Sequence, residues 1–444
     1  MIELLIVGAG PAGMSAALEA SSLGKTPVVI DNRPEPGGNI YSFLGSNRQH
    51  RSQRMKIFGP DYAKGAKLLD AFVEAVSAEK VIYHPNTRLW RLDQDGAFAY
   101  DGPMGSRAGQ AKSVVLATGA QERPMPLPGW TLPGVMGVGA AQILLKSGGE
   151  LPSGDIVVVG SGPLPLLLTV QLAKAGRPVK AVVEPDGASA LLSATSLAHH
   201  AVAAPKTAMK GIMLLAKRAL RRTPVWRKAT AISVDGDERA TGIKFRSGKE
   251  FRIDAENVLL HDGIVPNLNP VRAANLTTDY SEQQKTWHAQ SNDVIRLAGD
   301  GAGILGADAA VLSGRLAARE ICGTTASSAD LSAMAKQRSF RKFIDRAYPP
   351  VCPATNAAPD TVLCRCEMIR AHQVEQSIAT HGTDPNAIKR ALRVGMGPCQ
   401  GRMCGHSLAD FVGSKTQTTS EAVGLPRARN PILPVSFQIL AELD

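Results

Sequence analysis

Cysteine is scarce along most of this chain. The 444 residues include six cysteines, none of them before position 322, and four of the six lie between positions 364 and 404. A disulfide framework would need cysteines spread through the sequence, so this distribution excludes one. Clustered cysteines are instead typical of a metal site.

Long apolar runs are absent as well. No uninterrupted apolar stretch approaches the roughly 20 residues that span a bilayer, and Met1 leads directly into an apolar strand at 2–7 without a signal-peptide pattern. We therefore expect a cytoplasmic protein with no transmembrane segment, and peripheral contact with a membrane stays open. The length predicts two or three domains, because a single core of this size would be too large.

Acidic residues are outnumbered by basic ones, which gives a net charge of +11. Part of the excess forms a basic segment in mid-chain: Lys206, Lys210, Lys217, Arg218, Arg221, Arg222, Arg227 and Lys228. The simplest interpretation is a solvated helical face, and docking to an acidic subunit or a membrane surface is the alternative. Nucleic acid is not expected as a partner, because no recognition motif accompanies the charge.

A glycine-rich loop follows the first predicted strand. The loop Gly8-Ala9-Gly10-Pro11-Ala12-Gly13 leads into a helical stretch, and the next strand ends at Asp31, 18 residues after the third glycine. Gly8 allows a tight turn, Gly10 lets the backbone approach a pyrophosphate, and Gly13 lets the helix pack close to the sheet. Asp31 can accept hydrogen bonds from ribose hydroxyls. The pattern predicts a dinucleotide site, where the helix N-terminus stabilises anionic charge.

Three later segments favour FAD over NAD at this site. Residues 33–39 resemble the double-glycine segment of flavoproteins with two dinucleotide-binding domains, and 113–120 resemble their Ala-Thr-Gly return motif. Residues 294–301 resemble their closing motif, in which an Asp binds the ribityl chain or a phosphate-side hydroxyl. The candidate FAD-binding residues are Gly8, Gly10, Pro11, Ala12, Gly13, Asp31, Asn32, Arg33, Gly38, Asn39, Thr118, Gly119, Gly299 and Asp300.

A second strand–loop–helix unit follows at 156–184, with the loop Gly160-Ser161-Gly162-Pro163-Leu164-Pro165. Proline replaces the third glycine, and a bulkier residue there would push the helix from the sheet or shift its start. Both prolines are tolerable only within the first helical turn. The second return motif, at 261–267, is also altered. We favour a Rossmann-like domain kept for packing or for docking a partner, while NAD(P)H binding through Glu184 stays open.

The absence of cysteine from residues 1–321 excludes the redox dithiol of the pyridine-nucleotide disulfide reductases. Electrons must therefore leave the flavin by another route, and Cys364, Cys366, Cys399 and Cys404 offer one. The two close pairs, separated by 32 residues, resemble the [2Fe–2S] domain of the bacterioferritin-associated ferredoxin type, in which four thiolates bind two irons.

Other readings of these four cysteines stay open. Zinc is a competing metal, although structural zinc prefers two to four residues between paired cysteines, and a set without metal is the simplest alternative. Arg365 and Arg402 would offset the charge of a cluster and raise its potential. The residues between the pairs, about 370–394, predict short helices. Cys322 and Cys352 are expected to be inert thiols.

Together these patterns predict an α/β fold with two tandem Rossmann-like domains and a small helical C-terminal [2Fe–2S] domain. The FAD-binding domain is expected at 1–125 and 285–345, around a second Rossmann-like domain at 126–284 with a basic helical insertion at about 188–222. We expect a linker at about 348–359, the [2Fe–2S] domain at 360–420, and a proline-containing tail, extended on the surface, at 421–444.

The order of these motifs resembles one family nearly from end to end: the flavoprotein alpha (A) subunits of opine oxidase, D-hydroxyproline dehydrogenase, dye-linked proline dehydrogenase and hydrogen cyanide synthase. Segments 117–124, 128–135 and 261–263, the second glycine loop and the cysteine pattern carry the resemblance. It implies a hetero-oligomer in which an FAD-containing beta subunit of the D-amino-acid-oxidase type oxidises an amino acid or secondary amine. It leaves open an FMN between the subunits and a small third subunit.

By this resemblance the chain is the electron-transferring subunit of an oxidoreductase, and we identify no catalytic acid–base group in it. Two alternatives stay open. One is a self-sufficient NAD(P)H-dependent reductase that passes electrons through its cluster to a protein acceptor. The other is a scaffold whose first site holds a different adenine nucleotide.

Overall fold

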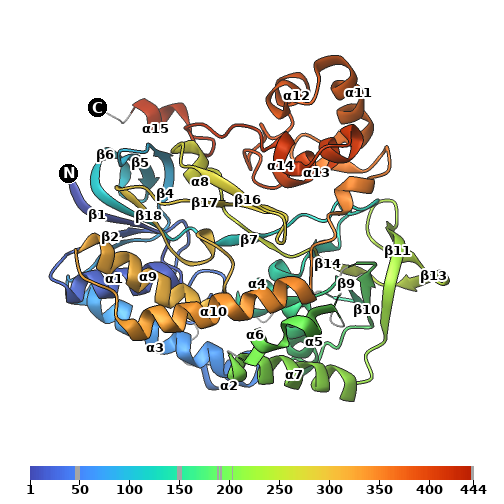
Figure 1. The fold of residues 1–444 in the computed structure, drawn as a ribbon, viewed down its shortest axis with the longest axis horizontal. Coiled ribbons are helices and arrows are strands. Elements are labelled where there is room, and N and C mark those ends of the chain that lie inside the picture. Colours follow the sequence, from blue (N-terminus) through green and yellow to red (C-terminus); the bar gives the residue numbers. More distant parts are fainter. Residues whose placement is uncertain (46–50, 148–152, 188–189, 191–192, 203, 442–444) are drawn as a thin grey trace.

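The computed structural model describes residues 1–45, 51–147, 153–187, 190, 193–202 and 204–441. Within these residues the chain forms two seven-stranded sheets, each with helices packed on it, and a mainly helical C-terminal lobe. Figure 1 shows this lobe, in orange and red, above the body that contains the sheets. The predicted α/β class with tandem Rossmann-like units is confirmed.

The first sheet has the order β3-β2-β1-β6-β5-β4, and β18 also pairs with β6. Its parallel strands are β1 (Ile2–Val7), β2 (Val28–Ile30), β3 (Ile82–His84), β6 (Gly105–Leu116) and β18 (Ile295–Leu297). β4 (Arg88–Leu92) and β5 (Ala97–Gly102) extend it in antiparallel pairing. β6 begins earlier than the strand expected from residue 113, because its first half pairs with β5.

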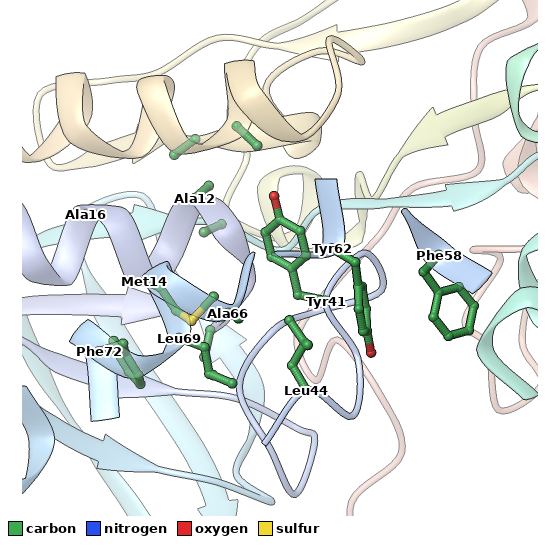
Figure 2. Packing of buried hydrophobic residues seen from close by; sticks show 14 of the residues in the cluster. Ala12, Met14, Ala16, Tyr41, Leu44, Phe58, Tyr62, Ala66, Leu69 and Phe72 are labelled. Atoms are coloured by element: carbon green, nitrogen blue, oxygen red, sulfur yellow. The ribbon is translucent and has the colours of Figure 1, made fainter. Parts of the chain in front are cut away.

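Three helices pack near this sheet and form the core beside the first glycine loop. α1 (Pro11–Ser22) contacts both α3 (Pro60–Ser77) and α9 (Ala307–Ile321). α2 (Arg51–Phe58) precedes α3. Figure 2 shows Met14 of α1 beside Ala66 and Leu69 of α3, with Tyr41 farther along the same buried cluster. The Tyr62 hydroxyl donates to the Ser42 carbonyl at 2.6 Å, so this core also holds the segment that follows β2.

The second sheet has the order β13-β12-β11-β10-β9-β14-β8. Its parallel part contains β8 (Val135–Gly137), β9 (Ile156–Gly160), β10 (Ala181–Pro185), β14 (Asn257–His261) and the first part of β11 (Val225–Asp235). β12 (Gly242–Ser247) and β13 (Lys249–Asp254) complete it in antiparallel pairing. Both sheets thus combine a parallel centre with an antiparallel extension, as expected for a repeated unit.

The helices of the second unit are α4 (Val138–Ser147), α5 (Pro163–Lys174), α6 (Ala198–Val202) and α7 (Pro205–Leu220). α5 contacts α4 and α7. The expected insertion contains a 3-10 turn at Ser193–Leu197 followed by α6 and α7, while residues 188–189, 191–192 and 203 lie outside the described residues. α10 (Ser328–Ala347) contacts α9 of the first unit and α6 of the second, so it ties the two units together.

Short elements connect the two sheets and the lobe. β7 (Ala120–Glu122) pairs with β15 (Ile264–Pro266), and β16 (Thr278–Ser281) pairs with β17 (Thr286–Ala289). α8 (Asn269–Ala273) follows β15. No helix among the described residues is both long enough and apolar enough to traverse a bilayer.

The C-terminal lobe contains the hairpin of β19 (Val362–Cys364) and β20 (Ile369–Arg370), followed by α11 (Ala371–His381), α12 (Pro385–Leu392), α13 (Gly405–Thr416) and α14 (Ser420–Val423). α11 and α12 are the short helices predicted between the cysteine pairs. Leu363, Val374, Ile388 and Phe411 fill the core of the lobe.

Two connecting segments are held by contacts with the rest of the chain. The segment expected as a linker is anchored: Cys352 and Ala354 are buried, and a 3-10 turn spans Pro353–Asn356. The tail is not simply extended, because it contains α14 and α15 (Phe437–Ala441). Between them Ile432 is buried, and its N–H donates to the Trp90 carbonyl of β4 at 2.6 Å.

Candidate cofactor sites and the junction between them

Two positions of the first glycine loop, Gly8 and Gly13, leave no room for a side chain. A Cβ on Gly13 would lie 1.7 Å from the Gly8 carbonyl oxygen, and one on Gly8, whose φ is +103°, would lie 2.5 Å from the Ala117 carbonyl oxygen. Gly10 precedes α1, which begins at the buried Pro11. The loop therefore takes the conformation in which backbone N–H groups at a helix N-terminus can face a pyrophosphate.

The closing segment meets this loop from the other side. A Cβ on Gly299, whose φ is +70°, would lie 2.8 Å from the Cβ of the buried Ala12. The adjacent Asp300 accepts hydrogen bonds from the Leu305 and Gly306 N–H groups, each at 3.0 Å. These bonds fix the Asp300 carboxylate at the start of α9. The structure thus brings the expected closing motif against the first loop.

The acid at the end of β2 is held by the backbone. The buried Asp31 carboxylate accepts from the Ala9 N–H at 2.5 Å and from the Arg33 N–H at 2.8 Å. Burial raises the pKa of Asp31, while these two donors act in the opposite direction. A carboxylate has lone pairs for further donors, so ribose hydroxyls remain compatible with this geometry. Asn32 is exposed to solvent.

The double-glycine segment lies close to the first loop. A Cβ on Gly38, whose φ is +60°, would lie 3.0 Å from the Cα of Gly10. Arg33 donates to the Gly38 carbonyl at 3.3 Å and also to the Asn39 side chain. The ring of Tyr41 packs on Gly65 of α3, where a Cβ would meet it at 2.2 Å. The segment is therefore clamped between α3 and the loop.

A buried lysine from the second unit holds the same segment. Lys146 of α4 is 4% exposed, and its ammonium donates to the carbonyls of Asn39 at 2.9 Å and Ile40 at 2.8 Å. Gln142, one turn earlier, accepts the third hydrogen bond at 3.2 Å. Burial, with a smaller contribution from Arg33, lowers the pKa of Lys146 to about 7. The sequence alone does not predict this role for Lys146, because the residue belongs to no recognisable motif.

The return motif lies across from this segment. A Cβ on Gly301, beside Asp300, would lie 3.5 Å from the Thr118 hydroxyl and 3.4 Å from the Gly119 nitrogen. The Asn39 side chain donates to the Ala120 carbonyl at 3.5 Å. The structure thus gathers the candidate FAD residues other than Asn32 around one strand-end region. Their individual roles stay predictions.

The second glycine loop has the same backbone plan. A Cβ on Gly160, whose φ is +138°, would lie 2.2 Å from the His261 carbonyl oxygen. α5 begins at Pro163, so the buried Pro165 lies in the first turn, where its missing N–H breaks no helical hydrogen bond. Both prolines of the loop thus lie in the first helical turn, where a helix tolerates them.

The surroundings of the second loop are already occupied by the chain itself. The Glu184 carboxylate faces Arg218 of α7 at 3.4 Å and Arg227 of β11 at 3.3 Å. The Cβ of Tyr348, which follows α10, would lie 4.0 Å from a Cβ on Gly162. His261 pairs with Glu122 at 2.8 Å. The acid that would hold a ribose therefore has two cationic partners within the protein.

The four clustered cysteines come together from two loops. Thiol hydrogen bonds join Cys404 to Cys364 and to Cys399, and another joins Cys399 to Cys366. A Cβ on Gly397 would lie 2.3 Å from the Cβ of Cys366, so this close approach requires glycine. Nevertheless, no group of three or more metal-ligating side chains among the described residues meets the geometry of a metal site.

The surroundings favour the deprotonated form of two of the four thiols, Cys364 and Cys399. The hydrogen bond from Cys404 lowers the pKa of Cys364 to about 6 and that of Cys399 to about 5, and backbone N–H groups act in the same direction. The hydrogen bonds that Cys404 makes to them, together with burial, raise the pKa of Cys404, and burial raises the pKa of Cys366. Thiolates are the form that binds metals. Arg365 and Arg402 are exposed beside the thiols. Burial raises the pKa of Cys352, as expected of an inert thiol.

The return motif touches the cysteine loop directly. The side chain of Gln121, in β7, donates to the Arg402 carbonyl at 2.6 Å. Asn269 of α8 donates to the Gln400 carbonyl at 3.1 Å. Because Gln121 follows Ala120, which the Asn39 side chain contacts, one short stretch of chain connects the double-glycine segment with the loop between Cys399 and Cys404.

A buried ionic group anchors the lobe beside this contact. Arg123 is enclosed by Asp262 of the second unit, at 4.0 Å, and Asp410 of α13, at 3.7 Å. Its guanidinium donates to the carbonyls of Gln284 and Lys285 at 3.0 and 2.6 Å. Asp262 also accepts from the Val351 and Cys352 N–H groups at 2.7 and 3.0 Å. Burial raises the pKa of Asp262 to about 6.

The fold and the first site define the class of this chain, a flavoprotein with two Rossmann-like units. The family model described as pyridine nucleotide-disulphide oxidoreductase matches residues 2–314, and it supports FAD in the first site. The model described as sarcosine oxidase A3 domain matches residues 363–443. The second match also includes most of the segment at 421–444, which we expected to be a tail distinct from the C-terminal lobe.

Full-length relatives narrow the assignment. The opine oxidase A-subunit of Rhizobium meliloti is 39% identical, with 99% of this chain and 87% of the relative covered. The hydrogen cyanide synthase subunit HcnB of Pseudomonas aeruginosa is 30% identical, with 99% and 98% covered. The chain belongs to the family of these oxidoreductase subunits. In fold it resembles the L-proline dehydrogenase of P. horikoshii, with a TM-score of 0.71 at 21% identity over 99% of this chain and 79% of that one.

Proposed function

We propose that this chain is the electron-transferring alpha subunit of a hetero-oligomeric amine or amino-acid dehydrogenase or oxidase. In this proposal FAD occupies the first dinucleotide site and a [2Fe–2S] cluster occupies the four-cysteine site. A separate FAD-containing beta subunit oxidises an opine or a hydroxyproline-like secondary amine, and this chain passes the electrons to an acceptor. The contact from Gln121 to the Arg402 carbonyl is the observation that carries the proposal, because it links the two sites.

The residues of the first site fit FAD. The positions at Gly8, Gly13 and Gly38 exclude side chains, which leaves backbone N–H groups to face a pyrophosphate. Asp31 and Asp300 are held by backbone donors on either side of the loop. An FMN shared with a partner subunit, and a small third subunit, remain part of the proposal on the family resemblance alone.

The chemistry of the four thiols fits an iron–sulfur cluster. Four cysteines match the ligand set of a [2Fe–2S] centre, and backbone N–H groups of Gly395, Gly401 and Met403 already point at sulfur. When bound, such a cluster would accept one electron at a time, whereas FAD can take two. Zinc stays the alternative metal, since four thiolates also suit it.

The rival function is a self-sufficient NAD(P)H-dependent reductase. It would need a nicotinamide nucleotide in the second unit, near Gly162 and Glu184. The pairing of Glu184 with Arg218 and Arg227, and the position of Tyr348 beside Gly162, speak against it. The first unit instead carries the features that a bound dinucleotide requires. A scaffold with another adenine nucleotide in the first site is a further rival.

Spectroscopy of the purified chain tests the two cofactors. We expect a flavin absorbance spectrum and, after reduction, an electron paramagnetic resonance signal of a [2Fe–2S] cluster. Cys366→Ser should change or abolish the resonance and leave the flavin bound, while Cys322→Ser serves as the control and should leave both unchanged. An unaltered resonance in Cys366→Ser would refute the ligand assignment. Mass spectrometry of the released nucleotide distinguishes FAD from other adenine nucleotides.

Co-expression with the beta subunit tests the relay. The complex should oxidise the amine, and this chain alone should not. Amine dehydrogenase activity of the isolated chain would overturn the assignment of substrate oxidation to a partner.

A further inference from the structure

The helix α7 is the least buried long helix of the second unit, and it has two different apolar faces. Its inner face lies against α5 through half-buried residues at helical spacing: Ala208, Gly211, Leu214, Leu215 and Arg218. No residue of α7 is fully buried. In Figure 1 this helix runs along the lower edge of the molecule, away from the C-terminal lobe.

The outer face of α7 is also apolar, although it meets solvent. Met209, Ile212, Met213 and Leu220 are 57%, 60%, 50% and 83% exposed. They recur every three to four residues, as does Ala216, so they share one side of the helix. Val202 of α6, 75% exposed, extends this stripe. Single exposed apolar residues are ordinary, but a row along one helix marks a contact surface.

A row of cations borders the stripe. Lys206, Lys210, Lys217 and Arg221 recur at intervals of four and seven residues and therefore line one flank of the apolar row. Residues 187–234 contain eight Lys and Arg residues and no Asp or Glu. Lys210 pairs with Asp61 of α3. The occupant of this surface must therefore be apolar along its centre and negatively charged at its edge.

We propose that the outer face of α7 binds the surface of an anionic membrane. Met209, Met213 and Leu220 would enter the boundary between headgroups and acyl chains, and the flanking lysines would reach anionic headgroups while their stems cover apolar surface. In this arrangement α7 lies parallel to the membrane surface, so the binding is peripheral. For this basic segment, docking to a membrane surface was the alternative to a solvated helical face, and the apolar row beside the charges favours that alternative.

The residue types favour lipid over a protein partner. Protein interfaces are enriched in aromatic residues and depleted in lysine at their cores. α6 and α7 contain no Phe, Tyr or Trp, and lysines border the stripe along most of its length. An apolar face that contains leucine, bordered by lysines, is typical of helices that lie in a membrane interface.

Vesicle sedimentation with the full-length, flavin-loaded chain tests the proposal. We expect it to bind phosphatidylcholine vesicles that contain phosphatidylglycerol, and to bind vesicles of phosphatidylcholine alone far more weakly. Met213→Glu/Leu220→Glu and Lys206→Glu/Lys217→Glu should each reduce binding about tenfold or more. All four positions lie on the exposed face, so flavin content and circular dichroism should stay unchanged.

Two matched controls make the test specific to α7. Met104→Glu changes an apolar residue that is 88% exposed elsewhere, and Arg246→Glu/Lys249→Glu reverses two charges on the hairpin of β12 and β13. Both should bind as the unaltered chain does. Absence of vesicle binding would overturn the proposal, and so would binding that resists Met213→Glu/Leu220→Glu, which would indicate simple charge adsorption. Protection of Met213 from oxidation by the beta subunit, without vesicle binding, would assign the face to a protein instead.

Discussion

The two dinucleotide units share a strand, a glycine loop, a helix and an acid at the end of the next strand, yet they differ in what surrounds the loop. In the first unit the acid, Asp31, accepts hydrogen bonds from backbone N–H groups of its own unit, and it has no cationic partner among the ion pairs of the described residues. In the second, Glu184 is paired with Arg218 and Arg227, and Tyr348 lies beside the loop. The two units therefore share the backbone conformation of the loop, but they differ in the side chains that would face a ligand.

The difference shows that one fold can serve two purposes in one chain. The second unit supplies Lys146, which clamps the double-glycine segment of the first, and Asp262, which helps to anchor the C-terminal lobe. Its side chains thus turn toward other parts of the protein. This supports a role in docking and packing for the second unit, and the following predictions test that contrast.

The largest effect is expected in the first loop. Gly13→Val places methyl groups where even a Cβ would lie 1.7 Å from the Gly8 carbonyl oxygen, so the loop must open. Overpacking of this kind should weaken FAD binding by roughly ten- to a hundredfold. Absorbance of the purified protein measures bound flavin. Pro165→Ala, at the corresponding position of the second unit, should retain all of its bound flavin. An equal loss of flavin in both variants would show that the two loops do not differ in this respect.

Removal of Arg123 should cost the most stability. Arg123→Met leaves Asp262 and Asp410 buried without their shared cation, which typically costs about 3–5 kcal/mol. Denaturant unfolding of the flavin-loaded protein measures the change. Arg246→Met, which removes an exposed ion pair, should change stability by about 1 kcal/mol or less. A similar small change in Arg123→Met would mean that the second unit does not anchor the lobe.

Replacement of Lys146 should weaken FAD binding moderately. Lys146→Met leaves the Asn39 and Ile40 carbonyls without their donor, a loss of about 1–3 kcal/mol if it is expressed in flavin affinity. Flavin titration of the apoprotein measures it. Lys174→Met, which removes an exposed amine that donates to the Lys56 carbonyl, should have no such effect.

The pH dependence of stability provides a second readout for Lys146. Its pKa is about 7 in the folded chain and 10.5 ordinarily, so unfolding takes up a proton between these values. Lys146 therefore contributes a rise in stability as pH increases from about 7 to 10.5. Lys146→Met should flatten this rise. An unchanged profile would show that the amine is not desolvated as its contacts indicate.

The smallest effect is expected for the second loop. Added NADH should leave the flavin absorbance of the isolated chain unchanged. Glu184→Gln should alter neither this result nor flavin content. Rapid bleaching of the flavin by NADH would contradict the contrast between the units and favour the reductase.

The sequence predicted those features whose cause is local. The loop from Gly8 to Gly13, the first-turn prolines of α5 and the short helices between the cysteine pairs all follow from residue spacing and backbone constraints. The family and the α/β class followed from the order of such motifs. Each of these features spans at most about 30 consecutive residues, so a linear pattern can reveal it.

Features that depend on distant partners were not predictable in this way. Lys146 lies on an ordinary amphipathic helix, and the two carbonyls to which it donates, those of Asn39 and Ile40, are more than 100 residues away. Arg123 lies within the segment 117–124, which carries the family resemblance, yet its carboxylate partners come from two other regions of the chain. The segment at 348–359 illustrates the same point: its prolines suggest a loop, while the hydrogen bonds that hold Val351 and Cys352 come from the distant Asp262.

The first sheet receives its last strand, β18, from residues 295–297, and α9 packs so closely on α1 that a Cβ on Gly314 would lie 2.0 Å from the Ala12 carbonyl oxygen. During synthesis the flavin pocket therefore cannot close until the ribosome has passed residue 314. By then every strand of the second sheet has been made. The second unit is thus complete first, and the flavin can be enclosed only afterwards, when the two distant parts of its own domain meet.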